Sequence, residues 1–321
     1  MKLLLAPMEG LADAPMRDLL CSVAGCDWAV AEFARVSATV LPARSFRRIV
    51  PELRNRSRTR SGVPVRAELL GSDPFAMAAN AAALGDLPPA GIDLNFGCPA
   101  PTVNRHRRGA VLLEEPELLR RIASAVRAAM PAPMPLSAKM RLGIGDPASA
   151  LNVARALADG GVDLLVVHAR TRCDGYRPPA HWEWIARVAE VVPVPVIANG
   201  EVWTVEDWRR CREISGIADV MLGRGAVAEP FLVERIRGGG RFCAQHDWPR
   251  LSGLIASFWH DVKRRLPARH APGRLKQWLN LLRRRYPQAQ TLFVMVRGAT
   301  EFGAIDLALA HCCSRPQALA A

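Results

Sequence analysis

Eight short apolar runs, separated by stretches with helical spacing, constrain the fold of this chain more than any other feature. Several runs are almost continuously apolar, as over residues 162–167, which predicts strands buried on both faces. Helical patterns lie between the runs, for example over Glu117–Met130 and Ser149–Ala158. The predicted strands are Leu3–Met8, Trp28–Phe33, Val63–Leu70, Gly91–Phe96, Leu136–Leu142, Val162–His168, Val194–Asn199 and Ala218–Gly223.

Two α/β folds are compatible with such an alternation of strands and helices. An open doubly wound sheet usually has fewer strands, and its Gly-x-Gly-x-x-Gly fingerprint is absent after the first run. Eight strand–helix units in about 240 residues are typical of a TIM barrel. We therefore predict a TIM (β/α)8 barrel.

The last part of the chain has helical periodicity and no strand pattern. Gly238-Gly239-Gly240 predicts a flexible hinge, so we expect a barrel domain over residues 1–240 and a helical bundle domain over residues 241–321. Prolines 267, 272 and 287 fall between the expected helices, where helices stop. These helices are Pro249–Leu266, Gly273–Tyr286 and Gln288–Phe302.

Positive charge is concentrated in the tail. The chain has 43 basic and 30 acidic residues, a net charge of +13. Residues 241–321 contribute 13 basic and 4 acidic residues, a net of +9, and the remainder contributes only +4. A polyanionic partner held by the tail fits this asymmetry, and a merely solvated basic surface fits it equally well.

The cysteines and the hydropathy argue against a secreted, disulfide-bonded or membrane-spanning protein. The eight cysteines form no CxxC pair and no spaced ligand set, which favours reduced cytoplasmic thiols over disulfides or a metal site. Pro7 and Glu9 interrupt the apolar start before it resembles a signal peptide. No uncharged apolar run approaches the ~18 residues of a membrane span, so we expect a cytoplasmic protein with no membrane association.

Polar and glycine residues cluster at the predicted carboxyl ends of the strands, where TIM barrels hold their active sites. The turn at Gly97 leaves Cys98 at the barrel mouth, and a thiol with the ordinary pKa of about 8.5 is protonated at neutral pH and can donate a proton. Lys139 lies within an apolar strand, where an isolated charge is costly, so it predicts an anionic or electron-rich partner such as a flavin. The glycines after strands seven and eight, with Arg224, are suited to a phosphate. Taken singly, the glycines can simply form turns, and His168 can be a core histidine.

Six segments resemble the tRNA-dihydrouridine synthase family. They are Ala6–Gly10, Asp93–Pro99, Lys139–Gly143, Val167–Thr171, Ala198–Glu201 and Leu222–Gly225. In the tail, Arg274-Leu275-Lys276-Gln277-Trp278-Leu279 is similar to the subclass that acts on uridine 16 of the tRNA D-loop. The resemblance implies an FMN enzyme that reduces the C5=C6 bond of uridine, with NADPH as electron donor. Hydride then passes from the reduced flavin N5 to C6, and Cys98 protonates C5.

The resemblance also implies roles for individual residues, and we expect a monomer without a metal. The tRNA contacts are Arg35, Asn95, Tyr176, Arg274, Lys276 and Arg297. The FMN contacts are Pro7, Met8, Glu9, Glu68, Lys139, His168, Asn199, Gly200, Glu201, Gly223 and Arg224. Without the family argument, Arg35 and Tyr176 fit ordinary surface packing, and Arg283–Arg285 fits a solvated helix face as well as a phosphate-binding patch.

Two positions depart from the family pattern. Relatives usually have glutamine at position 68, whereas an ionised Glu68 can only accept hydrogen bonds and repels the flavin carbonyls unless it is protonated. Relatives also have small residues where this chain has Arg105-His106-Arg107-Arg108. That loop can either contact tRNA phosphate or obstruct Cys98. Weaker FMN binding is therefore one hypothesis for this chain.

Two other functions compete with the family assignment. A flavin barrel that oxidises or reduces a small molecule has no need for the basic tail. An RNA-binding relative without catalysis is disfavoured by the presence of Cys98 and Lys139, although Glu68 and the arginine-rich loop leave it open.

Overall fold

Eight parallel strands form a closed barrel in sequence order in the computed structural model, which describes residues 1–314. Each strand pairs with the next, and β1 pairs with β8, with Leu3 opposite Val220. The predicted TIM barrel is therefore confirmed, and β2 continues two residues beyond the expected run. The strands are β1 (Leu3–Leu5), β2 (Trp28–Arg35), β3 (Val65–Leu70), β4 (Ile92–Phe96), β5 (Leu136–Arg141), β6 (Leu164–His168), β7 (Val196–Asn199) and β8 (Val220–Leu222).

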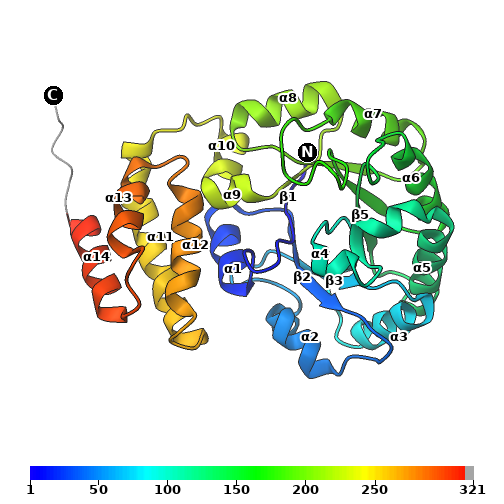
Figure 1. Cartoon of the computed structure of the whole chain (residues 1–321), viewed down its shortest axis with the longest axis horizontal. Helices are drawn as coiled ribbons and strands as arrows, with labels where there is room; N and C mark the ends of the chain where they lie inside the picture. Colours follow the sequence, from blue (N-terminus) through cyan, green and yellow to red (C-terminus); the bar gives the residue numbers. More distant parts are fainter. Residues whose placement is uncertain (315–321) are drawn as a thin grey trace.

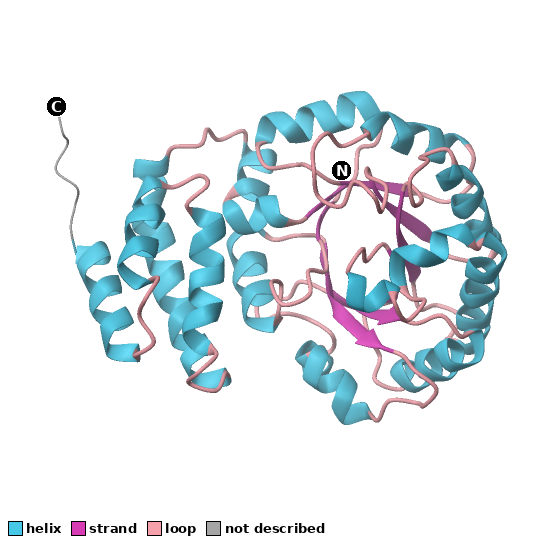
Figure 2. Ribbon diagram, viewed as in Figure 1, coloured by secondary structure: helices cyan, strands magenta, loops and turns pink. Residues whose placement is uncertain are grey.

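Helices surround the strands as an outer ring (Figures 1 and 2). Their starts carry ordinary capping signals: the side chains of Asp13 and Asp73 accept from the backbone of α1 and α3, and Thr204 with Asp207 forms a capping box on α8. The helices expected over Glu117–Met130 and Ser149–Ala158 are present as α5 and α6. The barrel helices are α1 (Ala14–Ala24), α2 (Ala43–Ile49), α3 (Pro74–Gly85), α4 (Pro101–Asn104), α5 (Pro116–Ala129), α6 (Ser149–Asp159), α7 (Trp182–Glu190), α8 (Val205–Ser215), α9 (Arg224–Ala228) and α10 (Leu232–Gly238), with 3-10 turns η1 (Pro51–Asn55) and η2 (Gly109–Glu114).

The barrel interior is divided into an apolar side and a polar side. The apolar side is a cluster of Leu4, Ala6, Val30, Val166, Ile197 and Met221. The polar side is built by alternate residues of β3, β4 and β5, because every second side chain of a strand points inward. It consists of Arg66, Glu68, Asp93, Asn95, Ser137 and Lys139.

Four further helices form the tail beside the barrel (Figure 1). They are α11 (Ala244–Arg265), α12 (Ala271–Leu282), α13 (Pro287–Val296) and α14 (Phe302–Ser314). The expected start of the first tail helix at Pro249 is wrong, since α11 begins at Ala244 and contains the proline. The expectation that the last helix runs to Phe302 is also wrong, because α13 ends before Gly298 and α14 follows separately.

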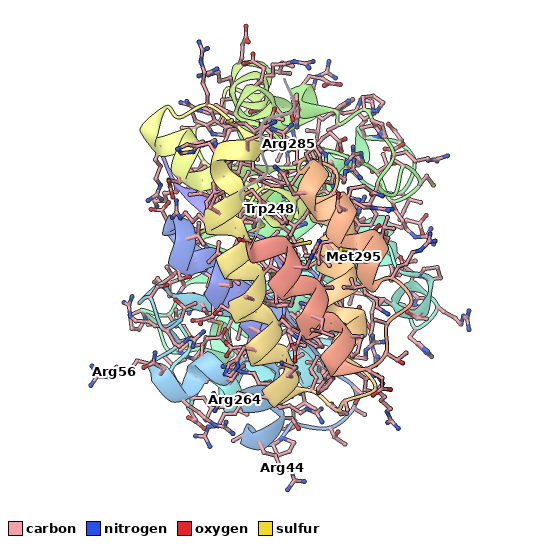
Figure 3. All side chains as sticks on the ribbon, turned by 90° about the vertical axis from the view of Figure 1, so that its left-hand side faces the viewer. Arg44, Arg56, Trp248, Arg264, Arg285 and Met295 are labelled. Carbon is pink, nitrogen blue, oxygen red and sulfur yellow. The ribbon has the colours of Figure 1, made fainter. Side chains whose placement is uncertain are left out.

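The tail packs directly on the barrel. The Trp278 indole on α12 donates to the Val227 carbonyl of α9 at 3.0 Å, and the Arg285 guanidinium pairs with the buried Glu229 at 2.8 Å. Figure 3 faces the tail and shows Arg285 near its upper end and Arg264 near its lower end. The division at residue 240 stays a prediction, and the last seven residues of the expected tail domain, 315–321, lie outside the described residues. Within residues 1–314, no helix is both long and apolar enough to span a membrane.

Candidate active site

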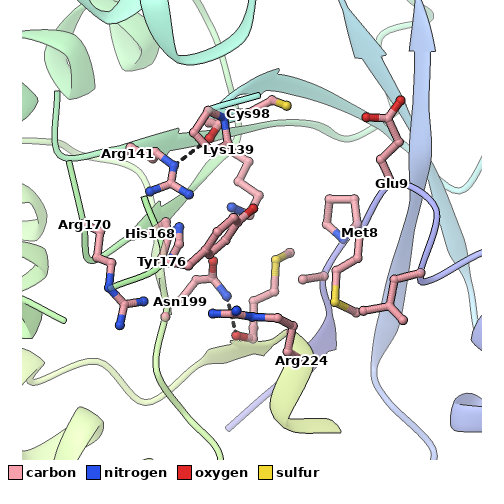
Figure 4. A pocket seen from close by; sticks show the side chains of 18 of the residues that line it. Met8, Glu9, Cys98, Lys139, Arg141, His168, Arg170, Tyr176, Asn199 and Arg224 are labelled. Atoms are coloured by element: carbon pink, nitrogen blue, oxygen red, sulfur yellow. Dashed lines mark hydrogen bonds between the residues drawn. The ribbon is translucent and has the colours of Figure 1, made fainter. Parts of the chain in front are cut away.

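A cavity of about 640 Å³ opens at the carboxyl ends of the strands. This volume lies within the usual range of ligand sites. Cys98 and all eleven residues expected to contact FMN line it. Figure 4 shows Cys98 at one end of the labelled residues and Arg224 at the other, with Lys139, His168 and Tyr176 between them.

Two asparagines fix the backbone on either side of the Cys98 thiol. The Asn95 Oδ1 accepts from the Gly97 and Cys98 amides at 3.1 and 3.0 Å. The Asn104 side-chain amide donates to the Cys98 carbonyl and the Ala100 carbonyl, both at 2.9 Å. The thiol itself is only partly buried and lines the cavity, so its position is set by its own strand and by the helix that follows.

A glycine is required next to this cysteine. Gly109 has φ +69°, and a Cβ there would lie 2.7 Å from the Cys98 carbonyl oxygen. The loop that carries Arg105–Arg108 therefore returns tightly against Cys98 at this glycine. The charged side chains of the loop turn elsewhere: Arg107 pairs with Glu115 at 2.5 Å, and Arg105 is exposed. Neither Arg105 nor Arg107 lines the cavity.

The surroundings raise the pKa of the Cys98 thiol and lower the pKa of the Lys139 ammonium. Burial raises the pKa of the Cys98 thiol, with a smaller contribution from the negative charge of Glu9. Burial, followed by the charge of Arg141, lowers the pKa of Lys139 to about 8. At neutral pH the cavity thus contains a protonated thiol and an ammonium that is still mostly charged.

Arg141 connects the strand ends around Lys139. Its Nε donates to the Gly97 carbonyl at 2.7 Å, and its Nη1 donates to the Thr171 and Gly175 carbonyls at 3.0 and 2.8 Å. One side chain of β5 therefore holds the loops after β4 and β6 together. These contacts hold in place the two loops that carry Cys98 and Tyr176.

His168 is a neutral imidazole in the cavity wall. Burial and the positive charges of Arg141, Lys139 and Arg170 lower its pKa well below the ordinary value. Gly200 lies against it with φ +115°, and a Cβ at that position would lie 2.6 Å from the His168 Cδ2. The close approach of β7 to β6 is therefore possible only with glycine at position 200.

The far end of the cavity is rich in arginine. The Arg224 guanidinium lies 4.5 Å from the Tyr176 ring centroid and 5.2 Å from that of Trp203. Arg170 pairs with Glu201 and donates from Nε to the Arg177 carbonyl at 2.6 Å. Its Nη1, however, is buried without a hydrogen-bond partner among the described residues.

These residues fit the phosphate end and the ring of a bound FMN. The orphaned Nη1 of Arg170 needs an acceptor, since an unsatisfied buried charged donor is costly, and an anion at this end of the cavity supplies one. Lys139 and the neutral His168 provide donors along the cavity wall. Among residues 1–314, no three histidine, cysteine or acidic side chains converge to hold a metal ion.

The residues expected to contact tRNA are not all in one place. Asn95 and Tyr176 line the cavity, and Arg35 lies at its margin, 3.9 Å from the Glu9 carboxylate. Arg274 pairs with Asp13 at 2.9 Å, and the Lys276 ammonium donates to the Ala299 carbonyl at 2.6 Å. Arg297 is exposed.

Sequence reasoning missed several residues of the site. Asp93 is buried on the polar side of the barrel, Asn104 holds Cys98, and Trp203 and Gln277 line the cavity. The alternation of β4 signals an inward Asp93 because Asn95, two residues on, also points inward. Gln277 belongs to the tail motif Arg274–Leu279, but nothing in that motif places it in a cavity formed by the barrel.

Comparisons with known proteins agree on one family. A family model described as dihydrouridine synthase matches residues 4–255. A tRNA-dihydrouridine(16) synthase of Aquipseudomonas alcaligenes is 55% identical over 312 residues, which cover 97% of this chain and 99% of that one. Another from Ralstonia nicotianae is 55% identical over 315 residues, covering 97% of each chain.

Solved structures resemble the barrel at low sequence identity. An old yellow enzyme homologue from Zymomonas mobilis superposes with a TM-score of 0.52 at 11% identity, covering 75% of this chain and 90% of that chain. Histamine dehydrogenase from Rhizobium sp. 4-9 gives a TM-score of 0.55 at 14% identity, covering 74% of this chain and 46% of that one. These likenesses support the fold, and the family match with the full-length relatives shows the lineage: the chain belongs to the dihydrouridine synthase family.

Proposed function

We propose that this protein reduces uridine 16 of the tRNA D-loop to dihydrouridine, with bound FMN as cofactor and NADPH as electron donor. Relatives that share 55% of their residues with nearly the whole chain are named tRNA-dihydrouridine(16) synthases. The observation that carries the proposal is the single cavity that brings the Cys98 thiol, Lys139 and the arginine-rich end together.

Bound FMN would supply the hydride, and the chain's own residues supply binding, orientation and the proton. Arg170 and Arg224 would hold the phosphate, and Lys139 would face the electron-rich ring. The neutral His168 can donate one hydrogen bond without adding charge.

Cys98 is the proposed general acid at C5 of the uracil. Its thiol is protonated at neutral pH because burial raises its pKa, and the two asparagine contacts hold its backbone in place. A proton donor with a fixed position and the correct protonation state typically contributes about 10²- to 10⁴-fold to a rate.

The substrate base must leave the stacked D-loop to reach this cavity. Tyr176, half exposed at the mouth between Arg141 and Arg224, offers an aromatic face for a flipped base. Gln277 of α12 also lines the cavity, so the tail reaches the site where the base would enter. The proposal includes a monomer that acts on tRNA in the cytoplasm.

Mapping dihydrouridine in cellular tRNA tests the proposal. Deleting the gene should abolish dihydrouridine at position 16 and leave other positions unchanged. Wild type and the surface variant Cys243→Ala should restore the modification, whereas Cys98→Ala should not. Retention of the modification at position 16 in the deletion strain, or its loss only at another position, would contradict the assignment.

A further inference from the structure

Two carboxyl groups face each other inside the barrel beneath the cavity. Glu68 on β3 and Asp93 on β4 are register partners, so their side chains leave neighbouring strands on the same face. They are 1% and 0% exposed. Two ionised carboxylates on neighbouring strands repel each other strongly when both are buried.

Each carboxyl has one satisfied oxygen and one orphaned oxygen. The Asn95 amide donates to Oε2 of Glu68 at 3.0 Å, and the Ser137 hydroxyl donates to Oδ1 of Asp93 at 2.5 Å. Oε1 of Glu68 and Oδ2 of Asp93 are buried with no donor among the described residues. Because the two side chains are neighbours on one face of the sheet, a single proton held between them can satisfy both orphaned oxygens.

Two cations, Arg66 and Lys139, adjoin the two carboxyls, and burial lowers the pKa of each. Lys139 on β5 lines the cavity beside them, and burial together with the charge of Arg141 lowers its pKa to about 8. The Arg66 guanidinium donates to the Ser137 hydroxyl at 2.9 Å and stacks on the Trp28 ring at 4.5 Å. Burial first, and then the charge of Asp93, raise the pKa of Glu68 well above its ordinary value. The titratable and charged groups facing the pair from adjoining strands and loops are Arg66, Lys139 and Cys98.

We propose that Glu68 and Asp93 share one proton, so that Glu68 lines the cavity as a neutral carboxylic acid while the pair retains a single negative charge beside Lys139 and Arg66. Asp93 is then a positioning residue that acts through Glu68. This inference concerns the protein without its cofactor and does not depend on the proposed reaction.

The effect of a neutral Glu68 on FMN binding rests on the proposed function. A neutral carboxylic acid has both a hydroxyl donor and a carbonyl acceptor, as a glutamine amide has both functions. Glu68 then brings no negative charge to the ring carbonyls of FMN. The repulsion expected from an ionised Glu68 is absent, and with it the reason to expect weakened FMN binding.

The pH dependence of apoprotein stability tests the shared proton. In the unfolded chain both carboxyls are ionised above about pH 4.3, whereas the folded pair retains one proton. The unfolded state therefore binds fewer protons, and stability falls as the pH rises toward the pKa of the pair. Glu68→Gln removes the shared proton and leaves Asp93 as a carboxylate beside Lys139. The unfolding temperature of this variant minus that of wild type should therefore increase by about 2 °C for each unit of pH from about pH 5.5 to 7.5.

Glu52→Gln is the matched control. Glu52 is also buried, but its carboxylate pairs with the Arg17 guanidinium at 2.9 Å. This substitution should lower the unfolding temperature by an amount that stays constant over the same pH range. If the Glu68→Gln and wild-type curves run parallel instead, the pair does not hold an extra proton and the proposal is wrong.

Infrared spectroscopy of the apoprotein gives a direct second readout. Wild type at neutral pH should show the carbonyl stretch of a protonated carboxylic acid, and this band should be missing in Glu68→Gln and present in Glu52→Gln. A wild-type spectrum without that band would overturn the proposal even if the variants fold poorly.

Discussion

At the scale of single residues, the chemistry depends on one thiol whose backbone is held from two sides. Asn95 is part of the strand before Cys98, and Asn104 is part of the helix after it. A fixed backbone limits the thiol to rotation about its own side-chain bond. The partial burial that raises its pKa also keeps its proton available at neutral pH.

Replacing the thiol tests its role as the acid. Cys98→Ala should lower the rate of uridine reduction by about 10²- to 10⁴-fold, because the proton at C5 must then come from water. FMN content and tRNA affinity should be retained, as measured by flavin absorbance and a binding titration. In wild type, the rate of uridine reduction should stay constant as the pH rises past the ordinary thiol pKa of about 8.5. It should fall only when the pH passes the raised pKa of Cys98, where the thiol loses its proton. Full turnover by Cys98→Ala would contradict the assignment, and Cys243→Ala serves as the control.

At the scale of elements, α12 is attached to the barrel by contacts between residues that are distant in sequence. The Arg274 guanidinium bonds both oxygens of Asp13, at 3.0 and 2.9 Å, and the Leu11 carbonyl at 2.9 Å. Asp13 also caps the start of α1, and the side chain of Arg274 is only 11% exposed. These contacts favour a structural role for Arg274, in addition to any contact with tRNA.

Loss of this ion pair should destabilise the protein. Arg274→Ala removes the partner of Asp13 and should lower the free energy of unfolding by about 2 kcal/mol, since partly buried charged hydrogen bonds contribute roughly this much. Asp13→Asn preserves the cap of α1 while removing the charge, so a double-mutant cycle of these two substitutions isolates the pair. Denaturant unfolding measures all four proteins. Unchanged stability with weakened tRNA binding would instead identify Arg274 as a tRNA contact.

At the scale of the whole molecule, the basic tail is partly neutralised by ion pairs with acidic residues of the barrel and of the tail. Arg285 pairs with Glu229, Lys263 pairs with Asp306, and Arg274 pairs with Asp13. The net charge of the chain nevertheless remains +13. Arg264 and Arg297 are among the exposed cations of the tail that stay available to a phosphate backbone.

Binding of tRNA should therefore depend steeply on salt. Each phosphate neutralised contributes a slope of about −0.7 to −0.9 in a plot of log affinity against log salt, so a tail that contacts four or more phosphates gives a slope near −3 or steeper. FMN affinity in the same buffers should change far less and serves as the control. A slope near zero would show that tRNA is not held through the basic tail.

Much of the site could be predicted from sequence because a TIM barrel converts strand order into spatial position. Once eight strands are recognised, the residues at their carboxyl ends must meet at one mouth, which is why Cys98, Lys139, Asn199 and Arg224 line one cavity. The tail helices were harder to delimit. A proline inside α11 and a glycine between α13 and α14 change the ends of helices without changing the apolar pattern.

The sequence by itself determined the barrel and the identity of the chemical groups at its mouth, since local periodicity is enough to specify strands and their inward faces. Only the tertiary structure decided which groups are neighbours. Arg274 meets Asp13 across 261 residues, Asn104 returns to Cys98, and Glu68 lies against Asp93. Burial and proximity set the charge of a side chain, and neither can be read from the order of residues along the chain.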